Sequence, residues 1–444
     1  MVLNNFIGLS SRFSMALDLV AVFLFYWVGI LYSPYANIIE LDFKYYLLMA
    51  GHSVIVVAFG LGAGFYDLSN ISRFFVRTFL NFSAHITALL ISVALVYFGY
   101  YSQIGRLAPI YGAMCSFAGL TLLKFGGFVW RRRFPVRFSV LGGKDYVPHI
   151  KDTFSGKSSG LKMLDSFPSI DGSIDGFLDG CKNKGVRLVV VSLPEIETSK
   201  FIELQIAARK KGVLILEFVD FYSKALERVP LGLVDERWVI EKGLFNQSRI
   251  QVILKRLVDI AISSFMLLGS LPFMLIVALG IKISSKGPIF FKQMRMGEFL
   301  EKFEMFKLRT MHITNEARKD GEVFTGKNDS RVFALGRLIR PLHIDELPQL
   351  LNILKGEMSF VGIRPESADF AEKMSKKIPI YPLRYIRKPG LTGHAQISQG
   401  YAMDTVEDTM IKLEYDFYYL LNYSIIMDFR IMLATGFNLT KGAR

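Results

Sequence analysis

The chain has 444 residues, of which 51% are hydrophobic, and its formal net charge is +14. It is too long for one ordinary domain and too apolar for a wholly soluble protein, so membrane segments are expected. The basic residues gather beside apolar segments, which fits anionic lipid better than nucleic acid. The two cysteines form neither a disulfide framework nor a metal-binding spacing.

Four apolar stretches occupy the first 133 residues, and each is long enough for about twenty residues of helix across a bilayer. They cover Met15–Ser33, Tyr46–Tyr66, Leu80–Tyr100 and Ala108–Trp130. The cations of the connecting segments gather on one side, where they are Arg12, Arg73, Arg77, Arg131, Arg132 and Arg133. By the positive-inside rule, both ends of this predicted four-helix transmembrane bundle face the cytoplasm.

Residues 134–245 alternate β-rich runs with helical patterns, which predicts a small cytoplasmic α/β domain of the Rossmann-like kind. The expected strands include Phe138–Leu141, Arg187–Val191 and Val213–Phe218, and the pattern of Thr198–Lys210 indicates a helix. Gly142-Gly143 could cradle a phosphate after the first strand, but no G-x-G-x-x-G motif occurs. A structural or oligomerising role, including a homodimer, is the alternative to a bound ligand.

A longer apolar stretch, Leu257–Ile283, has cations at both ends. Its length alone predicts a fifth crossing, but a crossing would carry the basic C-terminal region to the side opposite both ends of the bundle. Proline can interrupt a helix because it lacks an N–H group and clashes with the preceding turn. We therefore predict a re-entrant helix that breaks at Ser270 and Pro272 and enters and leaves on the cytoplasmic face.

Two adjacent acids, Asp345 and Glu346, stand among many cations in the C-terminal region. An acidic pair is usually the solvated start of a helix. Here the neighbouring cations are Lys307, Arg309, Arg331, Arg337, Arg340 and Arg364. That much positive charge beside two acids suits a site for phosphate and a divalent metal, and aspartate can attack phosphorus directly.

Four segments around this pair occur in order at close spacing: Phe306–Met311, Asp345–Leu350, Leu354–Glu366 and Lys388–Gln396. Together they resemble the catalytic domain of the bacterial sugar transferases, the monotopic polyprenyl-phosphate phosphoglycosyl transferases. The resemblance runs from about Ile250 to the C-terminus. The whole chain is similar to long members that act in capsule, exopolysaccharide or O-antigen synthesis. That family usually has serine directly before the proline of its helix break, whereas Leu271 intervenes here.

The resemblance implies a role for each residue of the site. Asp345 would be the catalytic nucleophile, kept ionised by the cations, and Glu346 would be catalytic and bind Mg²⁺. Substrate phosphates would contact Lys307, Arg309, Arg340 and Arg364, although each of these could instead bind lipid phosphate or a structural carboxylate. Glu366 is either a further metal ligand or a surface residue. Gln396 and His394 would lie in a loop near the nucleotide, where the family usually has an aromatic residue in place of His394.

These expectations describe a multidomain membrane protein with a four-helix transmembrane domain (1–133), a Rossmann-like α/β domain (134–245) and an α-rich catalytic domain (246–444) that contains the re-entrant helix 257–283. The implied reaction moves a sugar-1-phosphate from a nucleotide diphosphate sugar, such as a UDP-sugar, to undecaprenyl phosphate. It would release nucleoside monophosphate through an intermediate on Asp345, with Mg²⁺. The expected place is the cytoplasmic face of the bacterial inner membrane, in contact with lipid and without nucleic acid.

Two alternatives belong to other classes. A membrane-bound nucleotide-sugar dehydratase would need a dinucleotide fingerprint and a Tyr-x-x-x-Lys pair, and neither motif occurs in the chain. A non-enzymatic scaffold of polysaccharide export would account for the apolar helices and the α/β region but not for the acidic pair among cations.

Overall fold

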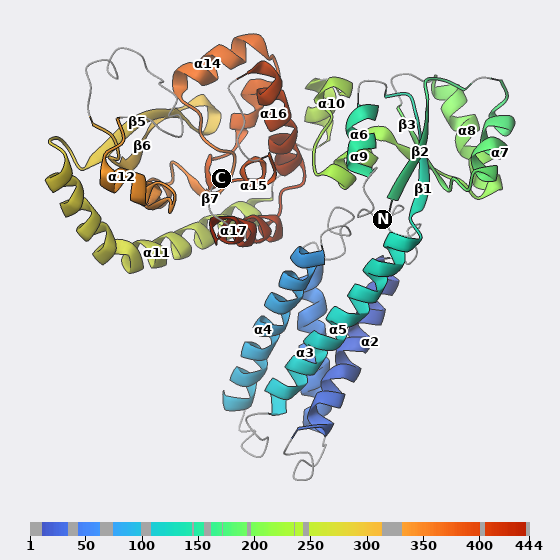
Figure 1. The fold of residues 1–444 in the computed structure, drawn as a ribbon, viewed down its shortest axis with the longest axis horizontal. Coiled ribbons are helices and arrows are strands. Elements are labelled where there is room, and N and C mark those ends of the chain that lie inside the picture. Colours follow the sequence, from blue (N-terminus) through green and yellow to red (C-terminus); the bar gives the residue numbers. More distant parts are fainter. Residues whose placement is uncertain are drawn as a thin grey trace. The chain divides into compact units, whose positions relative to one another are not determined.

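The computed structural model describes residues 11–33, 43–62, 74–98, 108–143, 146–154, 161–170, 172–192, 197–234, 236–242, 248–312, 331–399 and 405–440. Figure 1 labels its helices and strands. The chain divides into two compact units, Met1–Leu233 and Val234–Arg444. The division falls between Leu233 and Val234, before the boundary near residue 245 that the composition suggests.

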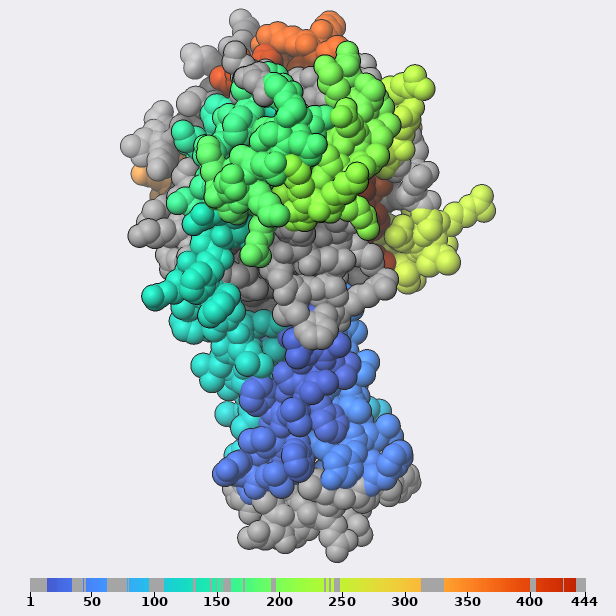
Figure 2. Space-filling model, turned by 90° about the vertical axis from the view of Figure 1, so that its right-hand side faces the viewer, coloured from blue at the N-terminus to red at the C-terminus, as the bar shows by residue number. Residues whose placement is uncertain are grey.

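Four helices open the first unit: α2 (Ser11–Leu31), α3 (Phe43–Gly62), α4 (Phe74–Phe98) and α5 (Ala108–Arg133). Both α2 and α4 contact α3 and α5. Figure 2 shows α2 and α3 side by side, in dark and lighter blue. Small residues allow α2 and α5 to approach closely, because a Cβ atom at Gly112 would lie 2.6 Å from the ring of Tyr26.

Three helical segments among the described residues are long and apolar enough to cross a membrane: Ser14–Leu31, Ala108–Trp130 and Arg249–Ser284. Tyr45–Leu61 and Leu80–Leu95 are shorter apolar helices. The expectation of a helical, membrane-like N-terminal region is therefore confirmed. The crossing of a bilayer by all four N-terminal helices stays a prediction.

A parallel sheet follows, with strands β1 (Val136–Leu141), β2 (Leu161–Phe167), β3 (Leu188–Val191) and β4 (Leu214–Glu217) in the order β2-β1-β3-β4. The helices of this region are α6 (Val147–Phe154), α7 (Ile174–Asn183), α8 (Thr198–Lys211) and α9 (Phe218–Leu226), with the short η3 (Leu231–Leu233) after them. Alternate residues of β3 enter two different buried clusters, as a strand with both faces covered requires. The predicted parallel α/β sheet is confirmed, and β2 was missed.

The two glycines after β1 both have positive φ, 76° at Gly142 and 68° at Gly143. A Cβ atom at Gly143 would lie 2.8 Å from the ring of Phe218, which is fully buried. Backbone conformation and packing therefore both require glycine at this turn, and a phosphate is not needed to explain it.

The second unit begins with α10 (Glu236–Glu241) and the long helix α11 (Arg249–Ser284). A β-hairpin of β5 (Phe290–Met296) and β6 (Lys302–Leu308) follows, joined through η4 (Glu298–Leu300). The remaining elements are α12 (Ala334–Ile339), η6 (Ile344–Glu346), α13 (Gln349–Lys355), β7 (Ser359–Val361), α14 (Ala368–Lys377), η7 (Tyr381–Ile386), β8 (Gly390–Thr392), α15 (His394–Gln399), α16 (Val406–Leu421) and α17 (Ile425–Thr440). Strands β7 and β8 pair in parallel.

Helix α11 starts with a capping box in which Ser248 and Gln251 exchange side chain to backbone hydrogen bonds. The helix continues through Ser270 and Pro272, so the predicted break of the helix at these two residues is wrong. The Oγ atom of Ser270 instead donates to the carbonyl of Leu267 at 3.3 Å. Figure 1 shows α11 as one bent helix. Its path through a membrane remains a prediction.

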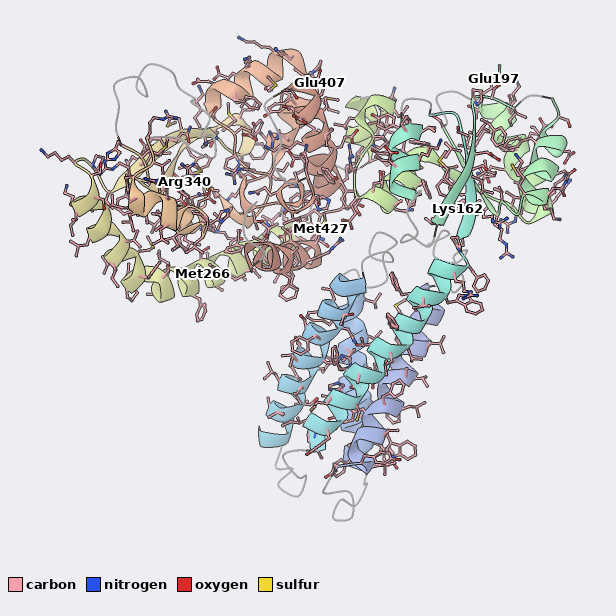
Figure 3. All side chains as sticks on the ribbon, viewed as in Figure 1. Lys162, Glu197, Met266, Arg340, Glu407 and Met427 are labelled. Atoms are coloured by element: carbon pink, nitrogen blue, oxygen red, sulfur yellow. The ribbon has the colours of Figure 1, made fainter. Side chains whose placement is uncertain are left out.

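The surface of α11 is largely apolar. Phe265, which is 81% exposed, and the neighbouring Leu268 and Ile276 project away from the protein. Figure 3 labels Met266 on this helix, and that residue packs instead against the core of the second unit. Exposed apolar side chains recur along the helix from Ile250 to Ile283, a pattern that marks an interaction or membrane surface.

Candidate active site

The two acids lie in a tight turn that precedes a buried helix. His343 has a φ of 54°, an uncommon conformation for a residue other than glycine, and η6 follows it with Asp345 and Glu346. The N–H of Glu346 donates to the carbonyl of His343 at 3.1 Å. Helix α13 is then anchored by Leu350 and Ile353, which are fully buried. The acids are therefore carried on a short, strongly constrained segment.

Glu346 is held between two cations from separate segments of the chain. Its Oε1 atom is 2.8 Å from Nζ of Lys307, in β6, and 3.6 Å from Nη2 of Arg364, which follows β7. Burial alone would raise the pKa of Glu346, but Lys307 and Arg364 outweigh it and lower that pKa to about 2. Glu346 is thus a carboxylate at any physiological pH. The predicted grouping of Lys307, Glu346 and Arg364 is present.

Asp345 has different surroundings. Burial raises its pKa, and the adjacent charge of Glu346 raises it further, while Lys307 and Arg340 act in the opposite direction. Burial and the charge of Glu346 thus outweigh the two cations at Asp345, and the expectation that the cations keep it ionised stays a prediction. A half-buried carboxylate with a raised pKa is more basic than a solvated one and keeps more of its nucleophilicity.

Arg340 caps the C-terminal end of α12, where Figure 3 labels it, and it lies close enough to Asp345 to lower that residue's pKa. Its predicted phosphate contact remains a prediction.

Arg309 has a different role from the one expected. It is 4% exposed, and its guanidinium donates to the Oγ and carbonyl of Ser285 and to the carbonyl of Lys286, at 2.8 to 2.9 Å. These bonds occupy the two terminal nitrogens with protein oxygens just after α11, while Nε is buried without a hydrogen-bond partner among the described residues. The structure therefore gives Arg309 a structural role in place of the predicted phosphate contact.

Gln396 and His394 lie in the short helix α15 and not in a loop. The ring of His394 is buried and packs near Tyr418, with centroids 5.3 Å apart, which is the position of a packed aromatic residue. Among the described residues, Oε1 of Gln396 is buried without a hydrogen-bond partner. A free buried acceptor is compatible with the predicted place near a nucleotide, which remains a prediction.

Glu366 belongs to a buried charge cluster that the sequence analysis missed. It forms ion pairs with Lys412 and with Arg384, and Arg384 also binds Asp416 at 2.8 Å. Burial would raise the pKa of Glu366, but Lys412 and Arg384 lower it to about 2. Glu366 is therefore not a surface residue, and its role as a metal ligand stays a prediction. Charged residues inside an otherwise apolar pattern, such as Asp416 among tyrosines and leucines, were the available signal.

Magnesium usually binds through one or two carboxylates and completes its shell with water and substrate phosphates. Within the described ranges, no group of three or more His, Cys, Asp or Glu side chains could hold a metal. Asp345 and Glu346 provide two adjacent carboxylates, and the raised pKa of Asp345 marks a place where a further positive charge would be favourable. The residues present fit a magnesium ion whose other ligands come from the substrate.

Residues 250–442 match the family described as bacterial sugar transferase. A UDP-N-acetylgalactosamine-undecaprenyl-phosphate N-acetylgalactosaminephosphotransferase of Aeromonas hydrophila is 42% identical over 193 residues, which are 44% of this chain and 45% of that protein. A UDP-glucose:undecaprenyl-phosphate glucose-1-phosphate transferase of Xanthomonas campestris pv. campestris is 33% identical over 269 residues, 60% of this chain and 55% of that protein. The chain thus spans about half the length of these curated relatives.

A third relative is shorter. An exopolysaccharide production protein of Rhizobium leguminosarum bv. phaseoli is 39% identical over 197 residues, and these are 43% of this chain but 98% of the relative. The match therefore covers nearly the whole of that protein. This chain belongs to the bacterial sugar transferase family.

Proposed function

We propose that this chain transfers a sugar-1-phosphate from a UDP-sugar to undecaprenyl phosphate and releases UMP, as a step in exopolysaccharide, capsule or O-antigen synthesis. The names of its relatives support the substrate classes. The observation that carries the proposal is the pairing of Glu346 with Lys307 and Arg364 beside a half-buried Asp345. This arrangement offers cations for a diphosphate next to a carboxylate able to attack it.

In the proposed reaction, a carboxylate oxygen of Asp345 forms a bond to the β-phosphorus of the nucleotide sugar. The bond from that phosphorus to the bridging oxygen breaks, and UMP leaves with the electron pair. An oxygen of the lipid phosphate then attacks the same phosphorus and frees Asp345. Neither step requires net proton transfer. Since the two substrates react in turn, the two anions need not occupy the site together.

Lys307 and Arg364 have two roles in this scheme. They keep Glu346 ionised, and their remaining N–H groups can donate to phosphate oxygens as negative charge moves onto the leaving group. Asp345 and Glu346 would hold Mg²⁺, which supplies charge neutralisation of the diphosphate when bound.

The proposal includes a place for the reaction. The four N-terminal helices would cross the membrane, and α11 would enter and leave the bilayer from the cytoplasmic face. The exposed apolar surface of α11 supports burial in lipid. A site built on such a helix would stand at the membrane surface, where a soluble donor and a lipid acceptor can both reach it.

Release of nucleoside monophosphate tests this function. Purified protein is incubated with a panel of nucleotide sugars, with and without undecaprenyl phosphate, and Asp345→Asn serves as the matched control. Continuous UMP release that needs the lipid acceptor and one UDP-sugar supports the proposal. A wild-type protein that releases no nucleoside monophosphate from any donor contradicts it.

A further inference from the structure

The three residues that form the ion pairs of the site come from three separate segments. Lys307 is in β6, Glu346 is in the turn before α13, and Arg364 follows β7. These segments are far apart in the chain, so local structure cannot set the distances between them. Each segment, however, has a hydrogen-bonded link to α11 or to the residues that immediately follow it.

The first link joins α11 to the helix that follows the acids. Arg256 donates from Nη1 to the carbonyl of Ile353 at 2.6 Å and from Nη2 to the carbonyl of Leu354 at 2.7 Å. The last carbonyls of a helix lack the usual partner four residues on, so Arg256 supplies donors at the end of α13. It pairs with the carbonyl of Leu354 and gives that of Ile353 a second donor beside the N–H of Gly356. The guanidinium fork thereby fixes the end of α13 against α11.

The second link joins α11 to the strand that precedes Arg364. Oδ1 of Asp259 accepts hydrogen bonds from Oγ of Ser359 at 3.0 Å and from the N–H of Phe360 at 2.9 Å. One turn earlier, Nζ of Lys255 donates to the carbonyl of Val361 at 2.8 Å. Asp259 is 4% exposed, so these bonds are made away from water and are costly to leave unmade.

The third link is at the other end of the helix. Arg309, two residues after Lys307, donates to Ser285 and Lys286, which directly follow α11. Between Ile250 and Ile281 the charged residues of α11 are Lys255, Arg256 and Asp259, and all three bond to segments that lead to the site. Charge is costly in an apolar helix, which argues for a specific purpose at these positions.

We propose that Arg256, Asp259 and Arg309 are positioning residues for the transfer, and that α11 is the common part that sets the spacing of Lys307, the acidic pair and Arg364. The inference rests on the proposed function. Its consequence is that one helix serves two purposes: its apolar surface contacts lipid, and its few polar residues assemble the site. Disturbing a polar link should therefore change catalysis without changing any residue that contacts substrate.

A double-mutant cycle on Asp259 and Arg364 tests this. Asp259→Ala removes the acceptor of both β7 bonds and should lower kcat/KM for UMP release by about tenfold or more. Asp259→Asn keeps an oxygen that can accept both bonds and should stay within about threefold of wild type. In an Arg364→Ala background, Asp259→Ala should cost much less than it does alone, because its effect acts through Arg364.

Two measurements keep the test decisive. Lys292→Ala, which removes an exposed cation paired with Glu304, is the matched control and should leave kcat/KM unchanged. The rate of amide hydrogen exchange in residues 359–364 reports on the bonds between Asp259 and β7 and does not depend on turnover. This rate should rise in Asp259→Ala but not in Asp259→Asn. Normal kcat/KM in Asp259→Ala, full additivity with Arg364→Ala, or unchanged exchange would overturn the inference. An inactive wild type with the expected exchange difference would contradict only the proposed function.

Discussion

The two adjacent acids differ in their electrostatic surroundings, and this difference supports the separate roles that we propose for them. Lys307 and Arg364 pair with Glu346, whereas burial and the charge of Glu346 raise the pKa of Asp345. A carboxylate held in a close ion pair is a poor nucleophile, so Asp345, at which burial outweighs Lys307 and Arg340, is the better candidate. The pattern of residue types predicts that both acids matter, but only the tertiary contacts distinguish them.

Substitution of the proposed nucleophile gives the first prediction. Asp345→Asn keeps the shape of the side chain and removes the attacking oxygen's charge, so kcat should fall by about a thousandfold or more. Glu346→Gln should retain more activity and should need a higher Mg²⁺ concentration, because one of two candidate metal ligands is weakened. The measurement is UMP release across a Mg²⁺ titration. Turnover near the wild-type rate in Asp345→Asn would remove Asp345 from the reaction.

The buried cluster around Glu366 gives a prediction about pH. The pKa of Glu366 is lowered from an ordinary value of 4.5 to about 2, so its ion pairs stabilise the fold above about pH 4.5 and this stability is lost as pH falls through about 2. The contribution at neutral pH is at most about 3 kcal/mol. Glu366→Gln should therefore unfold at a lower temperature than wild type near pH 7.

The difference in unfolding temperature between Glu366→Gln and wild type should become smaller as the pH falls, and it should disappear near pH 2. Intrinsic fluorescence in detergent follows the unfolding. The exposed pair Lys302–Glu372 is the control, and Glu372→Gln should show little difference at any pH. If the difference in unfolding temperature stays the same at low pH, Glu366 stabilises the fold through packing and not through its charge.

At the scale of elements, periodicity and composition predict much of the fold but not its polar links. The apolar runs predict α2, α5 and α11, and the β-rich runs predict three of the four parallel strands. The missed strand β2, Leu161–Phe167, mixes charged and polar residues with apolar ones and has an irregular register with β1. Its pairing is decided by tertiary contacts, which a local pattern does not contain.

The same limit explains Arg309 and Asp259. Arg309 lies within the segment Phe306–Met311, on which the family resemblance rests, yet the fold turns it toward the end of α11. Asp259 is a single carboxylate in an apolar run, which predicts that it has a buried partner but not which residues form it. The partner, β7, lies about a hundred residues away in the chain.

The path of α11 is open to a direct test. Single cysteines at Arg249 and Lys286, in a background where Cys115 and Cys181 are serine, report the two ends of the helix. If α11 enters and leaves on one side, a membrane-impermeant thiol reagent should label both positions in inside-out vesicles and neither in intact cells. Labelling of only Lys286→Cys in intact cells would instead indicate a fifth crossing.

At the scale of the whole molecule, the candidate catalytic residues all belong to the second compact unit, Val234–Arg444. One relative matches this chain over 197 residues, which are 98% of its own length. A member of the family can therefore consist of little more than the matched region. We infer that the N-terminal helices and the α/β region support assembly. A chain that starts at Val234 should release UMP at a rate within about tenfold of the full-length protein in lipid nanodiscs. Complete inactivity of a folded, lipid-inserted chain would show that the first unit contributes to the reaction.

The central claim is that the phospho-sugar passes through Asp345, and intact-protein mass spectrometry without the lipid acceptor tests it most directly. Wild-type protein mixed with its UDP-sugar and Mg²⁺ should gain the mass of one sugar phosphate, located on Asp345 by peptide mapping, and should release one UMP per chain. Undecaprenyl phosphate added afterwards should remove the added mass, and Asp345→Asn should never acquire it. UMP released only when donor and lipid are present together, with no adduct at any time, would contradict the account and favour direct transfer between the two substrates.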